Sequence, residues 1–228
     1  MAESALIIFD IDGTLLQTEL VTTPAVQRTF ASYGLPEPDS EAIHTFFGRP
    51  TEEYERWLAS LCPPGRALEI IEATNRLEIE LIGAEGRLYP GVRDMLTGLR
   101  NDGRVLGICS NGPDRYVNEF LDAHDVRRFF DIIRTRGTTY EGKVDMVREI
   151  LATIPARPAI VVGDRRDDIH AAHVNGALAI GACYGFGTAD ELASADAKAE
   201  SAIQIPDAIR QLIHREGTKR RRRRKPPP

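Results

Sequence analysis

Two carboxylates, Asp10 and Asp12, follow directly on an apolar run near the start of the chain. Residues 5–9 read Ala-Leu-Ile-Ile-Phe, and the next four read Asp-Ile-Asp-Gly. Side chains alternate along a strand, so we expect Asp10 and Asp12 to point to the same side. Two carboxylates this close tolerate each other only around a cation or a shared proton. The pair therefore predicts cation-assisted or acid–base chemistry at a strand end, and the alternative is an ordinary turn.

Polar residues follow the next apolar run in the same way. The segment 105–109 predicts a second strand, and Ser110 and Asn111 come directly after it. A hydroxyl and an amide beside the free N–H groups of a helix start form an anion site. Both residue types are also common helix caps, so the anion site and the plain cap remain equal alternatives at this point.

Lys143 is unusual because this chain uses arginine almost everywhere that it needs a cation. Four of its 29 basic residues are lysines, and Lys143 is the only one before Lys198. A compact ammonium differs from a planar guanidinium, so the position favours a point charge. A cation at a helix N-terminus opposes the helix dipole, and we therefore expect a nearby anion. The alternative is a solvent-exposed helix start.

Further carboxylates follow the apolar run 159–162. The sequence continues Gly-Asp-Arg-Arg-Asp-Asp, with Asp164 at the predicted strand end and Asp168 about one turn later. Because the carboxyl ends of parallel strands meet at one edge of a sheet, Asp164 is expected beside Asp10. Oxygen ligands of this kind suit Mg²⁺ better than zinc or copper.

Strands alternate with helices along most of the chain, which predicts an α/β fold with a parallel sheet between helical layers. The predicted strands are 5–9, 105–109, 132–134, 159–162 and 178–180. The predicted helices around them are 92–101, 113–123, 144–153, 168–175 and 205–215. Such a sheet gathers the residues described above at one edge.

Residues 17–87 have a different character, because several segments have helical periodicity and none is a clear strand. The predicted helices are 24–33, 40–47, 51–61 and 67–82, with Asp39 or Ser40 capping the second. We therefore expect a small helical domain at 17–87, inserted after the first strand of a parallel-sheet core at 1–16 and 88–214. A basic tail at 215–228 completes the predicted division.

Composition is that of an ordinary globular protein, with 42% hydrophobic and 28% charged residues. No apolar run approaches the ~20 residues that span a bilayer, so we expect no membrane contact. Three widely spaced cysteines form no metal-binding spacing, and with the acidic start of the chain they favour a reducing cytoplasm. Whether the protein is a monomer or a dimer stays open.

The C-terminus carries seven basic residues in a row, from Lys219 to Lys225. Without them the chain has 22 basic and 34 acidic residues, so the net charge of −5 hides an acidic body. Self-repulsion predicts a disordered tail from residue 215. Residues 219–225 are suited to weak contacts with nucleic acid or an acidic partner, although no aromatic residues are interleaved for base stacking. A solvated extension without a partner is the alternative.

Taken together, these residues resemble the haloacid dehalogenase superfamily, through four motifs in the family's order: Asp10-Ile11-Asp12-Gly13-Thr14, Ser110-Asn111, Lys143 and Gly163-Asp164-x-x-x-Asp168. The segments Gly-Asp-Arg-x-x-Asp-Ile-x-Ala-Ala from 163 and Tyr-Gly-Phe-Gly-Thr-x-x-Glu-Leu from 184 are similar to its phosphoglycolate-phosphatase-like branch. The resemblance implies a Rossmann-like core with an inserted helical cap. It also implies a Mg²⁺-dependent phosphatase that acts on a small phosphorylated metabolite such as 2-phosphoglycolate.

The resemblance implies roles for individual residues as well. Asp10 is expected to attack phosphorus and form an aspartyl-phosphate, and Asp12 to protonate the leaving group and then activate water. The implied metal ligands are Asp10, Asp164 and the backbone carbonyl of Asp12, with Asp168 as a ligand or the neighbour of one. The implied phosphate-binding residues are Gly13, Ser110, Asn111 and Lys143. Arg49 is a candidate for binding a carboxylate or second phosphate of the substrate, and a surface position is its alternative.

Within the superfamily the sequence disfavours some chemistries and leaves others open. Dehalogenases lack the second aspartate that Asp12 provides here, and phosphonate-cleaving relatives use a cap lysine, whereas residues 15–90 contain none. A sugar-phosphate mutase or a pyrophosphatase of the same superfamily remains an alternative. A non-catalytic protein that binds nucleic acid through its arginine-rich tail is the alternative of another class, although intact aspartates at 10, 12 and 164 disfavour it.

Overall fold

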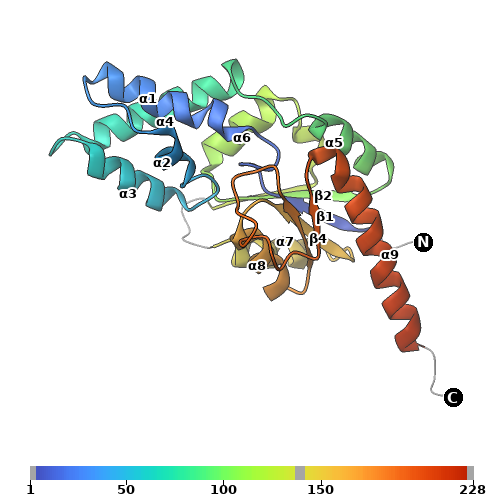
Figure 1. The fold of residues 1–228 in the computed structure, drawn as a ribbon. Coiled ribbons are helices and arrows are strands. Elements are labelled where there is room, and N and C mark those ends of the chain that lie inside the picture. The colour runs from blue at the N-terminus through green and yellow to red at the C-terminus, as the bar shows by residue number, and fades with distance from the viewer. Residues whose placement is uncertain (1–3, 137–141, 225–228) are drawn as a thin grey trace.

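The computed structural model describes residues 4–136 and 142–224, with side chains up to residue 218. Its centre is a six-stranded parallel sheet in the order β3-β2-β1-β4-β5-β6 (Figure 1). The strands are β1 Leu6–Phe9, β2 Val105–Ser110, β3 Ile132–Thr135, β4 Ala159–Gly163, β5 Leu178–Ala182 and β6 Ala197–Ala199. Helices flank this sheet on both faces, so the predicted α/β class is confirmed.

Alternate residues of β1 face two separate hydrophobic layers. Ile7 and Phe9 pack into a layer with α5 (Val92–Asn101), α6 (Asp114–Ala123) and α9 (Ile205–Arg224). Leu6 and Ile8 pack into a layer with α7 (Lys143–Thr153) and α8 (Arg166–Val174). All four side chains of the strand are fully buried, which explains why the sequence shows a continuous apolar run there instead of an alternation.

The central position of β1 decides which residues meet at the edge of the sheet. β1 pairs with β4 from Leu6–Ala159 to Phe9–Val162, and the Asp10 amide continues the ladder by donating to the Val162 carbonyl at 3.0 Å. The segments that follow β1 and β4 therefore begin side by side at this edge of the sheet. Five strands lie within two residues of their predicted ranges, whereas β6 is absent from the prediction because Ala-Lys-Ala has no β-branched or aromatic residue.

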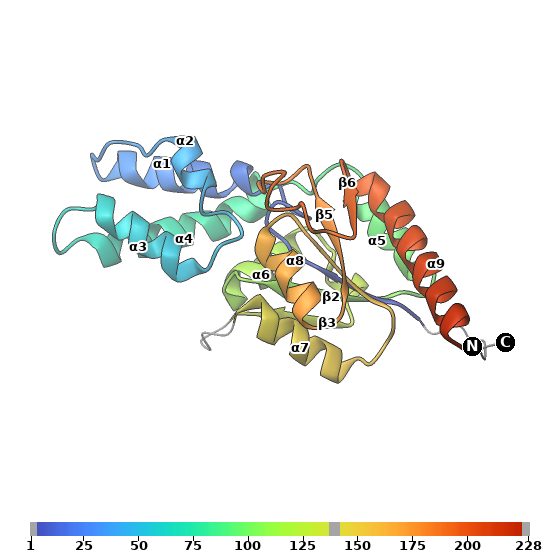
Figure 2. The same cartoon turned by 60° about the horizontal axis from the view of Figure 1, so that its bottom comes forward.

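Four helices lie between β1 and α5: α1 (Thr22–Ser32), α2 (Ser40–His44), α3 (Thr51–Leu61) and α4 (Ala67–Ala84). We call them the helical lobe, and both views show it at one end of the sheet, away from α9 (Figures 1 and 2). The lobe has its own apolar cluster, formed by Val26, Phe30, Ile43, Phe47, Leu58 and Ile70. The Asp39 carboxylate caps α2 by accepting from the amides of Glu41 and Ala42, as the sequence predicts.

The structure differs from the sequence prediction at the C-terminus. Disorder is predicted from residue 215, whereas α9 continues as a helix to Arg224. Ile205, Ile209 and Leu212 hold its first turns in the core, and arginine and lysine are good helix formers that extend it. Residues 225–228, and all side chains from 219 onward, lie outside the described part, as do the predicted partner contacts of 219–225. Within the described residues, no helix combines the length and the apolar character that crossing a bilayer requires.

Candidate active site

Three buried aspartates meet at the carboxyl edge of the sheet. Asp10 follows β1, Asp164 follows β4, and Asp168 lies in the first turn of α8. One carboxylate oxygen of each lies within 4.8 Å of the others, and none of the three residues is more than 1% exposed. The juxtaposition of Asp10 and Asp164 that the sequence predicts is therefore present.

Lys143 completes this group, and we call Asp10, Asp164, Asp168 and Lys143 the acid cluster. Its Nζ lies 2.7 Å from Asp10 Oδ2 and 2.6 Å from Asp168 Oδ1, at the buried start of α7. Burial alone would lower the pKa of the Lys143 ammonium, but the charges of Asp10 and Asp168 outweigh it and hold that pKa well above its ordinary value. The anion that we expect beside this lysine is thus a pair of aspartates.

The acid cluster has more negative than positive groups. Burial raises the pKa of Asp10 well above its ordinary value, although the Lys143 ammonium opposes this rise. Burial, together with the charge of Asp168, raises the pKa of Asp164 to about 7. Asp164 Oδ2 accepts from the Phe186 amide at 2.7 Å, whereas Asp164 Oδ1 is buried with no hydrogen-bond partner among the described residues. A hard cation with oxygen ligands is the kind of group that fits this orphaned oxygen and its two carboxylate neighbours.

Asp168 differs from the other two aspartates because both of its oxygens have partners in the chain. Oδ1 accepts from Lys143 at 2.6 Å, and Oδ2 accepts from the Arg165 amide at 3.1 Å. The second contact belongs to a capping box at the start of α8. Asp168 therefore fixes the lysine and the helix start together.

Asp12 lies in a different environment from Asp10, although one residue separates them. Its Oδ1 accepts from the Tyr116 hydroxyl at 2.7 Å and from Thr18 Oγ1 at 2.8 Å. Burial raises the pKa of Asp12, and these two hydrogen bonds oppose part of that rise. Neither Tyr116 nor Thr18 is predicted from the sequence as a site residue. Tyr116 has the pattern of a core aromatic residue of α6, and nothing in the sequence links either residue to Asp12.

Ser110 and Asn111 are both buried at the end of β2, as the sequence predicts. The Ser110 hydroxyl accepts from the Gly112 amide at 3.0 Å. The Asn111 amide donates to the Gly48 carbonyl of the helical lobe at 3.0 Å, and Thr51 Oγ1 donates to the Asn111 carbonyl at 3.3 Å. Asn111 thus links the core to the lobe directly above the site.

Two glycines allow the chain to approach the acid cluster closely. Gly13 has φ +71°, and a Cβ there would lie 2.3 Å from Asp164 Oδ2. Gly48 has φ +73°, and its Cβ would lie 2.9 Å from Arg165 Cγ and 4.0 Å from Asp10 Oδ2. Both positions exclude a side chain sterically and favour glycine conformationally, so the sequence-predicted Gly13 is a requirement of the site.

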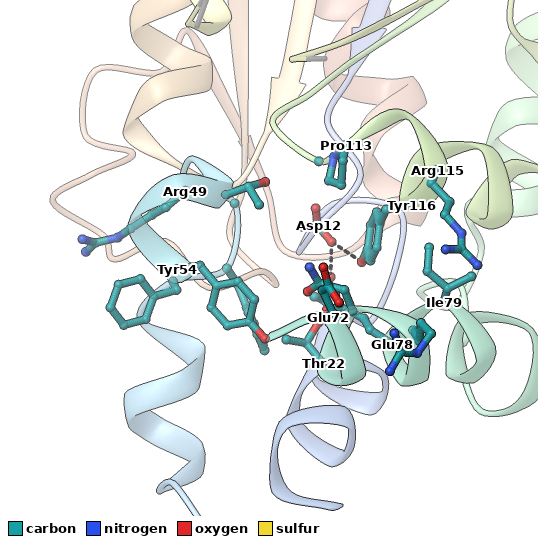
Figure 3. Close-up of a pocket in the computed structure, with 18 residues that line it drawn as sticks. Asp12, Thr22, Arg49, Tyr54, Glu72, Glu78, Ile79, Pro113, Arg115 and Tyr116 are labelled. Carbon is teal, nitrogen blue, oxygen red and sulfur yellow. Dashed lines mark hydrogen bonds between the residues drawn. The ribbon is translucent and has the colours of Figure 1, made fainter. Parts of the chain in front are cut away.

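A cavity of about 480 Å³ opens between the helical lobe and the core, and Asp12 lies in its wall. Figure 3 shows Tyr116 beside Asp12, with Thr22, Glu72 and Glu78 of the lobe facing them. Arg49 also lines the cavity, but its guanidinium points away from Asp12 (Figure 3) and lies 3.9 Å from the Glu53 carboxylate. The structure therefore places Arg49 at the rim and not over the acid cluster.

A parallel α/β sheet with an acid cluster at its carboxyl edge, and a cavity lined by the neighbouring Asp12, is an arrangement suited to phosphoryl transfer. The chain belongs to the haloacid dehalogenase-like hydrolases, since the model of that family matches residues 7–182. The fold and the family resemblance predicted from the motifs are thus confirmed.

Relatives and solved structures agree with this family. The chain is 30% identical over 217 residues to a phosphoglycolate phosphatase of Pseudomonas fluorescens, a match that covers 91% of this chain and 78% of that protein. It is also 30% identical over 193 residues to a 5'-nucleotidase of Pseudomonas aeruginosa, covering 82% and 86%. A predicted phosphoglycolate phosphatase of Haemophilus somnus has the same fold, with a TM-score of 0.82 at 21% identity over 92% of this chain and 99% of that one. The family and these relatives indicate that the chain is a phosphatase.

Proposed function

We propose that this protein hydrolyses a small phosphate monoester through an aspartyl-phosphate on Asp10. One observation carries the proposal: two aspartates from one strand end lie in two environments. Asp10 lies in the acid cluster beside Lys143, whereas Asp12 faces the cavity and is held by Tyr116 and Thr18. A nucleophile and a general acid need this kind of separation, because one must be ionised while the other carries a proton.

The first step transfers the phosphoryl group to the enzyme. A carboxylate oxygen of Asp10 forms a bond to phosphorus while the ester P–O bond breaks, and Asp12 gives its proton to the departing oxygen. The raised pKa of Asp12 favours the protonated form that this transfer needs. In the second step Asp12 takes a proton from water, whose oxygen attacks phosphorus and frees the Asp10 carboxylate together with inorganic phosphate.

Lys143 and the buried end of β2 support the transferring group. We expect the Lys143 ammonium, 2.7 Å from Asp10 Oδ2, to offset charge on the phosphoryl oxygens, and the buried Ser110 and Asn111 to donate hydrogen bonds to them. The residues that would hold Mg²⁺ are Asp10, Asp164 and the carbonyl of Asp12, next to Asp168. When bound, Mg²⁺ would supply positive charge that favours ionised Asp10 and offsets the charge of the phosphate.

The helical lobe, with its flanking segments at 17–87, is proposed to act as the cap that selects the substrate. It forms most of the cavity wall opposite Asp12 and contacts the core through Asn111 and Gly48. 2-Phosphoglycolate is a candidate ester because relatives of this chain are phosphoglycolate phosphatases.

Release of phosphate from p-nitrophenyl phosphate tests the proposal. We expect activity that requires Mg²⁺, disappears with EDTA and returns when Mg²⁺ is restored. Asp10→Asn should lose at least ~10³-fold in kcat, because the amide is no nucleophile. Asp94→Asn, at an exposed position of α5, makes the same chemical change and should leave the rate unchanged. Mg²⁺-dependent activity that survives in Asp10→Asn would overturn the mechanism.

A further inference from the structure

The lobe side of the cavity contains polar groups that the proposed chemistry does not use. Tyr54 of α3 lines it, and α4 contributes Glu72, Asn75, Arg76, Glu78 and Ile79. The residues 72, 75, 76 and 79 follow the i, i+3, i+4, i+7 spacing of one helix face, and Glu78 lies at its border. This wall faces Asp12, so a leaving group bound above Asp12 meets it (Figure 3).

The Tyr54 hydroxyl is buried and has no hydrogen-bond partner among the described residues. Figure 3 shows its ring pointing from α3 toward the side of the cavity where Thr22 lies. A buried hydroxyl without a partner costs about 1–3 kcal/mol of folding free energy, so such groups normally have one. The position of Tyr54 in the cavity wall indicates that its partner comes from the cavity.

Glu78 provides the matching acceptor. One oxygen of its carboxyl accepts from the Thr22 hydroxyl, which fixes the side chain at the junction of α1 and α4. Burial raises the pKa of the Tyr54 phenol and the charge of Glu78 adds to the rise, yet no hydrogen bond joins the two side chains. Asn75, by contrast, already donates to Glu55 at 3.1 Å. Tyr54 and Glu78 thus contribute a donor and an acceptor to the same side of the cavity.

We propose that Tyr54 and Glu78 together bind a hydroxyl group of the leaving group, so that the preferred substrates are phosphate monoesters of polyols. A hydroxyl accepts from Tyr54 and donates to Glu78 at the same time. A carboxylate only accepts, so it could accept from Tyr54 but would be repelled by an ionised Glu78 in the same wall. This inference rests on the proposed phosphatase function and assigns the substrate class of that site.

The test uses two esters of the same chain length, glycerol 1-phosphate and propyl phosphate, with p-nitrophenyl phosphate as a reference. For the full chain with Mg²⁺, we expect kcat/KM for glycerol 1-phosphate to exceed that for propyl phosphate by about tenfold or more. Tyr54→Phe should remove most of this preference, about fivefold to tenfold, chiefly through KM. For propyl phosphate, which has no hydroxyl group for Tyr54 to bind, the same variant should change kcat/KM much less than it does for glycerol 1-phosphate.

Two further variants separate binding from folding. Glu78→Met keeps the length of the side chain and removes the acceptor, so it should reduce the same preference in the same direction. Tyr33→Phe makes the tyrosine change at a partly exposed position of the lobe that does not line the cavity, and it should have no effect.

The results that contradict each proposal differ. A wild-type protein that hydrolyses p-nitrophenyl phosphate but treats the two alkyl esters alike would overturn the polyol assignment alone. The same holds if 2-phosphoglycolate is the better substrate and Tyr54→Phe leaves it unaffected, because the rim arginines Arg76 and Arg115 would then bind its carboxylate. If no ester, p-nitrophenyl phosphate included, is hydrolysed, the phosphatase proposal fails and this inference fails with it.

Discussion

At the edge of the sheet, Lys143 contacts Asp10 and Asp168 at 2.6–2.7 Å, whereas in the neighbouring cavity the Tyr54 hydroxyl has no hydrogen-bond partner among the described residues. The acid cluster lies on β1, β4, α7 and α8, which the parallel sheet holds together. The lobe side of the cavity lies on helices inserted between β1 and α5. Lys143 is therefore held by partners within the protein, whereas the Tyr54 hydroxyl is free to form a hydrogen bond with a ligand.

Asp12 lies in the cavity wall two residues after Asp10 of the acid cluster, and its replacement gives the largest expected effect. Asp12→Asn keeps the shape but cannot donate a proton from a carboxyl group, so kcat for an alkyl phosphate should fall by about 10²–10⁴. The phosphoryl-transfer step with p-nitrophenyl phosphate should suffer much less, because p-nitrophenolate leaves without a proton. Rapid mixing should therefore show a burst of p-nitrophenol followed by slow turnover. Equal losses in the burst and in the alkyl ester rate would contradict the acid role of Asp12.

Lys143 tests how strongly the acid cluster depends on its internal cation. Lys143→Met leaves Asp10 and Asp168 buried without their ammonium, and we expect a loss of about 3–5 kcal/mol in the free energy of unfolding, together with loss of activity. Urea unfolding at pH 7 without added metal measures it. Lys198→Met, at an exposed position, is the matched control and should change stability by less than ~0.5 kcal/mol. An unchanged midpoint for Lys143→Met would show that the pairing does not stabilise the fold.

The pH dependence of stability tests the burial of Glu78 in the cavity wall. Burial raises the pKa of Glu78 to about 7 from 4.5, with the nearby charges of Asp12 and Glu55 adding to the rise. Because the folded state holds this proton more tightly than the unfolded chain, its stabilising contribution is complete below pH 4.5 and is lost as pH rises through 7. Glu78→Gln removes that loss, so the variant should be about 1–3 kcal/mol more stable than the wild type at pH 8.

Unfolding curves at pH 4 and pH 8 measure this difference, which should vanish at the lower pH. Glu80→Gln, on the exposed side of the same helix, should show no such dependence. A Glu78→Gln variant less stable than the wild type at pH 8 would show that Glu78 is ionised and stabilising in the fold.

Arg49 gives the smallest expected effect. Its side chain is 45% exposed, lies 3.9 Å from Glu53 and is near the Phe46 ring at the rim. Exposed ion pairs contribute ~0–1 kcal/mol, so Arg49→Ala should change KM and stability little, with KM within about threefold for any ester. A tenfold or larger rise in KM for an anionic ester would instead support the substrate contact that the sequence suggests.

The acid cluster could be predicted from the sequence because each member follows a buried strand or begins a helix. Parallel strands bring such positions to one edge, and this rule places Asp10 beside Asp164 without any knowledge of packing. Lys143 could be singled out by its residue type alone. The partners of Asp12 could not be predicted, since Tyr116 and Thr18 meet it only after α6 and the chain before α1 have packed.

In the helical lobe, too, the helices could be predicted from the sequence but their contacts could not. Its four helices follow from their periodicity and from Asp39, but the face that each presents to the cavity depends on how the lobe lies against the core. Tyr54 and Glu78 therefore read as ordinary helix residues in the sequence. At the other end, a run of like charges predicts disorder from residue 215, while the intrinsic helix preference of those residues and the docked start of α9 extend the helix to Arg224.

The scarcity of lysine has a practical consequence for anyone who wishes to attach a dye or a surface to this protein. Of the four lysines, Lys143 is buried, ion-paired and held as an ammonium, so amine-directed reagents cannot reach a free base there. Lys198 is exposed, and Lys219 and Lys225 lie in the C-terminal basic run. Amine-directed reagents should therefore attach to lysines outside the acid cluster, and the labelled protein should keep the activity that it had before.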